Sequence, residues 1–284
     1  MFAAALKRCQ VALSLMLVAL TLTACASSGS TEAVLTSVAP LTDKYAAIVV
    51  DAKSGKMLYG ANVNELRYPA SLTKMMTLYL MFEAIDEGRV SRTDLIPISR
   101  NAARRPPSKL GLKAGETIPV DTAIRVLVVK SANDVATAVA EFLGGSEARF
   151  AEMMTAKARA LGMNRTVFKN ASGLPDPDQV TTATDMARLS IALRRAFPHH
   201  YGYFGHREVT VAGRTIKGHN KALDMIPGAD GLKTGYTRAS GFNLATSVTR
   251  GGKSVVGVVM GENTSKIRNA RMAQLMSTYV KKAR

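Results

Sequence analysis

Strand-like patterns occur near both ends of this sequence, and helix-like patterns fill most of the stretch between them. Residues 45–50 are apolar and β-branched, residues 51–56 favour a turn, and residues 57–59 return to a strand pattern. Residues 242–248 and 254–260 form a second predicted hairpin around a Gly-Gly turn. Because strands and helices do not alternate, the sequence predicts an α+β fold with one antiparallel sheet built from both termini.

Apolar residues at helical spacing mark the central part of the sequence. The strongest pattern runs over residues 71–87 and ends at Gly88. Further helices are predicted at residues 121–129, 133–142, 147–161, 182–197 and 265–280. Most of these helices lie between the two hairpins in the chain, so they predict a helical subdomain inserted into the sheet.

The chain is strongly basic, with a formal net charge of +17 over 284 residues. Such a charge suits a partner rich in carboxylates or phosphates. The sequence shows no zinc-ligand cluster, no aromatic RNA-binding run and no Lys/Arg block, and it contains no Trp. We therefore exclude nucleic acid as a partner and interpret the charge as attraction to an anionic cell wall or envelope surface.

The N-terminal residues are typical of a secretory signal. Lys7 and Arg8 precede an apolar run at residues 11–22, which is shorter than the roughly 20 residues that span a bilayer. We predict a signal peptide over residues 1–25, a flexible tether over residues 26–43 and a catalytic domain over residues 44–284. The chain would then be exported to the bacterial periplasm or cell envelope.

Two cleavage modes fit the end of this signal. Leu22-Thr23-Ala24-Cys25 resembles a bacterial lipobox, in which Cys25 would become the lipidated first residue and contact the membrane. Ala24-Cys25-Ala26 also fits the A-x-A pattern that releases a soluble protein. We favour the lipoprotein because a polar tether follows Cys25. The other cysteine, Cys9, lies within the signal, so the folded domain has neither disulfides nor thiolate metal sites.

Ser71-Leu72-Thr73-Lys74 places a hydroxyl and an amine three residues apart at the start of a predicted helix. Residues at this spacing share a helix face, so the Lys74 amine can reach the Ser71 hydroxyl. A serine becomes nucleophilic beside a base, and a desolvated lysine near another cation can serve as that base. Ser71 and Lys74 are therefore candidate catalytic residues, although the motif alone is unspecific.

Two further motifs follow in a characteristic order. Ser131-Ala132-Asn133 begins about 60 residues after Ser71, and Lys233-Thr234-Gly235 begins about 100 residues later. Taken alone, Asn133 predicts a helix cap equally well. Together, the three motifs match the signature set of penicillin-binding proteins and class A β-lactamases.

The residues around these motifs resemble the low-molecular-mass D-alanyl-D-alanine carboxypeptidases over residues 45–280. The matching segments are residues 68–77, 131–134, 171–175 and 230–237. The resemblance implies the transpeptidase-like fold of β-lactamases and penicillin-binding proteins. It also implies a serine-type carboxypeptidase that removes the terminal D-alanine from peptidoglycan stem pentapeptides through an acyl-enzyme on Ser71. Such an enzyme would be inhibited by β-lactam antibiotics.

The resemblance also implies roles for the matched catalytic residues. Ser71 would attack the carbonyl between the two D-alanines, with Lys74 as its base. Ser131 would relay a proton to the departing D-alanine, and Asn133 would hold both Lys74 and the substrate amide.

The same resemblance implies a set of substrate-binding residues. Lys233 would lower the pKa of Lys74 and attract the terminal carboxylate of the substrate. Thr234 and Arg268 would bind the same carboxylate. Gly235 would allow close approach of the strand, and the backbone N–H of Tyr236 would complete an oxyanion hole with that of the nucleophile. For Arg268, a solvated basic helix face is the alternative.

No cofactor or metal is expected. We predict surface positions for His199, His200 and His206, with no ligand pattern among them, and a position near the cleft for His219. A β-lactamase is disfavoured, because no Glu-x-x-Leu-Asn segment lies between Asn133 and the Lys-Thr-Gly motif. A D,D-endopeptidase that cleaves crosslinks uses the same groups and remains open. A non-catalytic wall-binding protein is a third alternative, disfavoured by the complete set of motifs.

Overall fold

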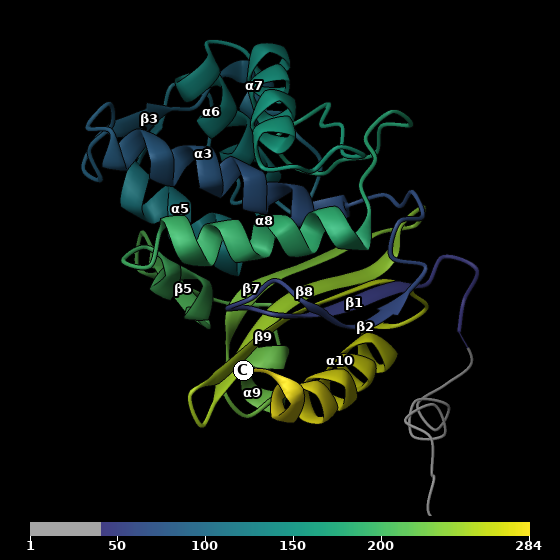
Figure 1. Ribbon diagram of the computed structural model, residues 1–284. Coiled ribbons are helices and arrows are strands. Elements are labelled where there is room, and N and C mark those ends of the chain that lie inside the picture. The colour runs from purple at the N-terminus through teal and green to yellow at the C-terminus, as the bar shows by residue number, and fades with distance from the viewer. Residues whose placement is uncertain (1–40) are drawn as a thin grey trace, which may run out of the picture. The chain divides into compact units, whose positions relative to one another are not determined.

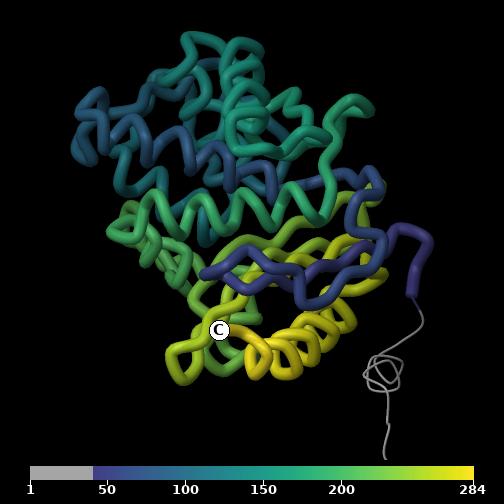
Figure 2. The backbone as a smooth tube through the Cα atoms, viewed as in Figure 1, coloured from purple at the N-terminus to yellow at the C-terminus, as the bar shows by residue number. Residues whose placement is uncertain are grey.

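The computed structural model describes residues 41–284 (Figures 1 and 2). The predicted signal peptide, the lipobox with Cys25 and most of the predicted tether lie outside these residues. Among the residues that are described, no helix combines the length and the hydrophobicity needed to cross a bilayer.

A five-stranded antiparallel sheet in the described part of the chain joins residues from its two ends, as the sequence predicts. Its order is β2-β1-β9-β8-β7. The strands are β1 (Ala46–Asp51), β2 (Met57–Ala61), β7 (Ala229–Thr237), β8 (Gly241–Arg250) and β9 (Lys253–Glu262). β1 pairs with β9 across more than 200 residues of sequence, with Ala46 opposite Met260.

Helices cover both faces of this sheet, and this explains the nearly continuous apolar pattern of its central strands. α10 (Ser265–Tyr279) packs on β8 and β9 from one side, whereas α8 (Ala183–Ala196) packs on β1, β8 and β9 from the other (Figure 1). Eight consecutive residues of β9 are therefore buried, from Val255 to Glu262.

The helical part of the fold is built around α3 (Lys74–Asp86), whose residues from 74 to 82 are all buried. A helix that is apolar on every side belongs in the interior, and α3 contacts α5, α6, α7 and α8. The remaining helices are α4 (Arg100–Ala103), α5 (Val120–Val129), α6 (Asn133–Gly144), α7 (Glu147–Ala160) and α9 (Ala222–Met225).

Short elements complete the fold. Two small antiparallel pairs consist of β3 (Leu95–Pro97) with β4 (Thr117–Pro119), and β5 (Glu208–Val211) with β6 (Arg214–Lys217). The 3-10 turns are η1 (Ala70–Thr73), η2 (Tyr201–Gly205) and η3 (Val280–Lys282). No apolar alternation predicts β7, where only the family resemblance places Gly235 on a strand, and the sequence patterns also miss β3, β4 and β6.

Candidate active site

A cleft of about 660 Å³ lies between the edge strand β7 and the helical part of the fold. Ser71, Ser131, Asn133, Thr234 and Arg268 all line it, so the structure brings the three sequence motifs together. Lys74 and Lys233 lie behind this lining, with 0% and 2% of their surface exposed.

Ser71 belongs to the 3-10 turn η1, and Lys74 is the first residue of α3. The predicted helix therefore exists, but its first turn is tighter than an α-helix. Leu72 and Met75 are fully buried and anchor this turn in the core. The Lys74 amine donates a hydrogen bond of 3.2 Å to Ser71 Oγ, which confirms the contact predicted from the spacing.

The Lys74 amine has two further acceptors, Asn133 Oδ1 at 2.8 Å and the Ser172 carbonyl at 2.5 Å. An ammonium group has three protons to donate, so the three contacts account for its full hydrogen-bonding capacity. The position of the amine is thus determined by α6, by the segment around Ser172 and by the serine that it would activate.

Complete burial holds the pKa of Lys74 well below its ordinary value, because a charged amine is costly to desolvate. The positive charge of Lys233 lowers this pKa further, while the carboxylate of Asp134 raises it. A buried amine with a depressed pKa can be neutral near physiological pH and can then accept the proton of Ser71.

Asn133 does not act as a helix cap. Ala132 occupies the N-cap position of α6, and the amide of Asn133 instead donates 3.0 Å to the Pro106 carbonyl while accepting from Lys74. The preceding Ser131 has φ of +60°, and its buried Oγ has no hydrogen-bond partner among residues 41–284. A strained backbone and a free buried hydroxyl are costly, and such features concentrate at functional sites.

Lys233, Thr234 and Gly235 belong to β7, which pairs with β8 on one side and borders the cleft on the other. A Cβ atom at Gly235 would lie 3.0 Å from the backbone nitrogen of Ser71, so glycine allows the strand to approach the nucleophile turn closely. Burial, followed by the nearby Arg268, lowers the pKa of Lys233 to about 7.

Arg268 is buried, with 4% of its surface exposed, so the alternative of a solvated basic face is wrong. Its guanidinium donates to Asn269 Oδ1 and to the Asn243 carbonyl, and burial lowers its pKa to about 10. Tyr236 extends into the cleft region with 55% exposure and stacks on Phe242 at a centroid distance of 4.2 Å.

Residues 170–174 carry no motif that assigns them a role, although residues 171–175 belong to the family resemblance. The side-chain oxygen of Asn170 accepts from the backbone nitrogens of Ser172 and Gly173, and this fixes the turn that presents the Ser172 carbonyl. Gly173 has φ of +84°, and a Cβ there would lie 1.9 Å from the Ala70 carbonyl. The Ser-Gly pair in the sequence was the available signal for this close contact.

The histidines differ from prediction in one respect. His219 lines the cleft as expected, but His200 is buried, and it shares the Asp86 carboxylate with His199. Three potential ligand atoms of this cluster lie within 4.8 Å of one another. Arg92 lies 3.1 Å from Nδ1 of His200 and can only donate, so Nε2 carries the proton that goes to Asp86. A metal-binding Nε2 would carry no proton, so the cluster is a hydrogen-bonded one.

The cleft therefore combines a hydroxyl beside a buried amine with two further cationic side chains. This arrangement can attack a carbonyl carbon and can hold a nearby carboxylate.

Comparison with known proteins agrees with this geometry. A family model described as D-alanyl-D-alanine carboxypeptidase matches residues 34–264. The D-alanyl-D-alanine carboxypeptidase DacF of Bacillus subtilis is 35% identical over 235 residues, covering 81% of this chain and 60% of that protein. The chain thus spans less than two thirds of the length of that relative.

Two solved structures are similar in fold. The D-alanyl-D-alanine carboxypeptidase DacD from Francisella tularensis has a TM-score of 0.80 at 30% identity, covering 84% of this chain and 70% of that one. Penicillin-binding protein D2 from Listeria monocytogenes, in its ampicillin-bound form, has a TM-score of 0.75 at 31% identity, covering 82% and 95%. These matches confirm the predicted fold. The chain belongs to the D-alanyl-D-alanine carboxypeptidase family.

Proposed function

We propose that the protein is a serine-type carboxypeptidase that removes the terminal D-alanine from peptidoglycan stem pentapeptides. The observation that carries this proposal is the contact between Ser71 Oγ and the Lys74 amine at 3.2 Å, with Lys74 fully buried behind a cleft that Thr234 and Arg268 line. Its family membership and the length of the match support the same activity.

In the proposed reaction, Ser71 Oγ attacks the carbonyl carbon of the penultimate D-alanine and passes its proton to Lys74. The backbone N–H groups of Ser71 and Tyr236 stabilise the oxyanion. Collapse of the tetrahedral intermediate breaks the C–N bond, and the departing D-alanine takes a proton through Ser131. Water then hydrolyses the ester on Ser71 and releases the shortened peptide.

The cationic side of the cleft explains the preference for a free C-terminus. Thr234 and Arg268 line the cleft, and the Lys233 amine lies just behind it, where it donates to the Thr234 carbonyl at 3.0 Å. A terminal carboxylate placed there would form charge-assisted hydrogen bonds and offset part of the positive charge of Lys233 and Arg268. The amide of a β-lactam ring, which also carries a carboxylate nearby, would acylate Ser71 in the same orientation.

A second activity, D,D-endopeptidase cleavage of crosslinks, is favoured by one feature of the cleft. Its lining also includes Lys130, His219 and Lys221, and its volume of about 660 Å³ has room for a leaving group larger than alanine. Lys130 and Lys221 would suit the additional carboxylates of a crosslinked acceptor strand.

Mass spectrometry of the products separates the two activities. The purified protein is incubated with a pentapeptide ending in D-Ala-D-Ala and, separately, with a crosslinked dimer, with Ser71→Ala as the control. Loss of one alanine from the pentapeptide alone would establish the carboxypeptidase, whereas cleavage of the dimer alone would establish the endopeptidase. If the wild-type protein changed neither substrate, the proposed function would be wrong.

We also propose that the protein is exported to the bacterial envelope and anchored by a lipid on Cys25. The basic residues, apolar run and lipobox-like residues 22–25 support this proposal. Expression of the full chain in a bacterium, followed by mass determination of the mature N-terminus, tests it. A diacylglyceryl-modified Cys25 is expected, and Cys25→Ala should abolish the modification. An unmodified mature N-terminus would contradict the lipid anchor.

A further inference from the structure

Two short segments hold the acceptors of the Lys74 amine other than Ser71, which are the Ser172 carbonyl and the side chain of Asn133 on α6. The first segment, residues 170–174, presents the Ser172 carbonyl. The second, residues 105–108, holds Asn133, because the Pro106 carbonyl accepts from the Asn133 amide and the Ser108 carbonyl accepts from its backbone nitrogen at 2.6 Å. The distance between these segments therefore contributes to the position of the amine.

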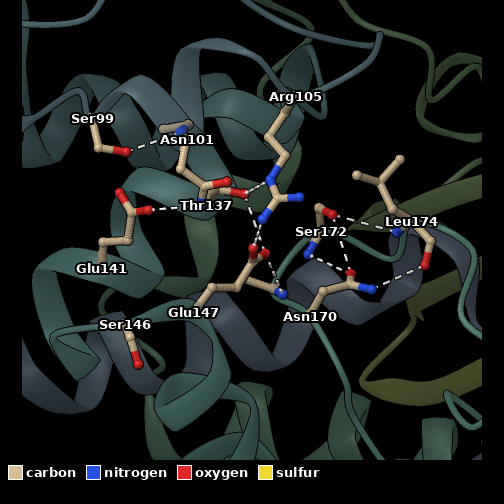
Figure 3. A network of polar contacts seen from close by, with 12 residues as sticks. Ser99, Asn101, Arg105, Thr137, Glu141, Ser146, Glu147, Asn170, Ser172 and Leu174 are labelled. Carbon is tan, nitrogen blue, oxygen red and sulfur yellow. Dashed lines mark hydrogen bonds and ion pairs between the residues drawn. The ribbon is translucent and has the colours of Figure 1, made fainter.

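An ion pair between Arg105 and Glu147 joins the two segments (Figure 3). Glu147 Oε2 pairs with Nη2 of Arg105, while its Oε1 accepts from the backbone nitrogen of Ala171 at 3.2 Å. Thr137 closes the network, because its hydroxyl donates 3.2 Å to Glu147 and accepts 3.1 Å from Nε of Arg105. Glu147 thus contacts the residue next to Ser172, and Arg105 is the residue next to Pro106.

Neither partner of this ion pair lines the cleft. The side chains of Arg105 and Glu147 are 30% and 10% exposed, and both line a separate cavity of about 680 Å³. Substrate in the cleft would therefore not touch them. A charged pair that is mostly withdrawn from water and bonded to a backbone amide also has a well-defined geometry.

A shift of Ala171 would be transmitted directly to the reactive groups. The carbonyl of Ala171 accepts a hydrogen bond of 2.7 Å from the hydroxyl of Thr77, which lies one turn beyond Lys74 on α3. The next residue in the chain after Ala171 is Ser172. The contact from Glu147 thus constrains Ala171, which is hydrogen-bonded to α3 through Thr77 and covalently bonded to Ser172, the residue whose carbonyl accepts from Lys74.

We propose that the Arg105–Glu147 pair is a positioning device that holds both acceptors of the Lys74 amine at the distance required for proton transfer from Ser71. The inference rests on the proposed function, because it assigns the pair a role in the reaction of Ser71.

The test compares three variants of the full chain. Glu147→Ala removes the acceptor of both Arg105 and Ala171, whereas Glu147→Gln keeps an oxygen that can accept from the Ala171 nitrogen. Lys157→Met is the matched control, since Lys157 also lies on α7 and its pair with Glu83, at 2.6 Å, has similar exposure. The Lys157 pair joins α7 to α3 but contacts neither acceptor segment.

Acylation by a fluorescent penicillin provides the first measurement. Glu147→Ala is expected to slow the first-order acylation step roughly 10- to 100-fold, because small misplacements of reacting groups reduce rates by such factors. Its non-covalent dissociation constant should change by less than about threefold. Glu147→Gln keeps the contact with Ala171 but loses the ion pair with Arg105, so it should recover only part of the rate. Lys157→Met should acylate at the wild-type rate even if its melting temperature falls equally.

The second measurement needs no reaction. ¹³C NMR of labelled lysine follows the titration of the Lys74 amine in the free protein. Displacement of the Ser172 carbonyl in Glu147→Ala would weaken a hydrogen bond that favours the ammonium form, so the pKa of Lys74 should fall further. The charged groups that face the amine, Lys233 and Asp134, are unchanged in this variant.

Either an unchanged acylation rate or an unchanged or raised Lys74 pKa in Glu147→Ala would overturn the inference. If Glu147→Ala does not fold, Arg105→Ala breaks the same pair from the other segment and should slow acylation at least fivefold. If the wild-type protein is not acylated at all, the proposed function fails, and the NMR titration alone decides whether the pair positions the amine.

Discussion

Replacement of Gly173 by alanine tests how closely the segment behind Ser71 is packed. The added Cβ would lie 1.9 Å from the Ala70 carbonyl oxygen and 2.3 Å from its carbon, and both are backbone atoms that cannot rotate away. To reach ordinary contact the segment must move by on the order of 1 Å. The Ser172 carbonyl, which accepts from Lys74 at 2.5 Å, would move with it.

The expected losses follow from this geometry. A non-glycine residue in the left-handed region costs roughly 1–2 kcal/mol, and overpacking adds about 1–3 kcal/mol. A total near 3 kcal/mol lowers the melting temperature of a domain of this size by roughly 6–12 °C. A displacement of about 1 Å at the amine is expected to slow acylation of Ser71 roughly 100-fold.

Thermal unfolding and acylation by a fluorescent penicillin measure these two effects. Gly162→Ala is the matched control, because Gly162 has φ of +75° but nothing lies within 4 Å of its added Cβ. The control should show the conformational cost alone and acylate within about threefold of wild type. If Gly173→Ala resembled Gly162→Ala in both measurements, the close packing of this segment on Ala70 would not matter for the amine.

Three further variants test the electrostatics and the packing. Lys233→Met removes a positive charge that lowers the pKa of Lys74, so this pKa should rise. The acid limb of the acylation pH–rate profile should then move to higher pH, and an unmoved limb would contradict Lys74 as the base. Asp134→Asn removes the charge that raises the same pKa, so the limb should move to lower pH, and a shift in the other direction would exclude Lys74 as the base. Arg271→Met leaves Glu262 buried without its cation and should cost about 3–5 kcal/mol in denaturant unfolding, whereas adding Glu262→Leu should restore most of it. A single variant as stable as wild type would show that this pair is not needed.

The sequence predicts the reactive pair from local spacing, and it predicts the sheet architecture from the order of strand and helix patterns along the chain. Ser71 and Lys74 meet since their separation matches one helical turn, and β1 and β9 are recognisable as apolar strands. β7 was missed because an edge strand that borders a cleft carries polar residues and glycine instead of an apolar alternation.

Contacts between distant segments could not be predicted in the same way. The Ser172 carbonyl is a backbone group, so no side chain identifies it as an acceptor of Lys74. Arg268 and His200 are buried, although arginine is mostly exposed in proteins and histidine is only of intermediate burial. Their burial depends on partners such as Asn269 and Asp86, which only the folded chain brings to them.

The most direct test of the account is to locate the acyl group itself. The protein is incubated with ampicillin, digested with trypsin and analysed by tandem mass spectrometry of the peptide Tyr68–Lys74, which contains Ser71 and Thr73. If Ser71 is the nucleophile, Ser71 should carry the mass of the opened antibiotic and Ser71→Ala should carry no adduct. An adduct on another residue, or a wild-type protein that stays unmodified, would contradict Ser71 as the nucleophile.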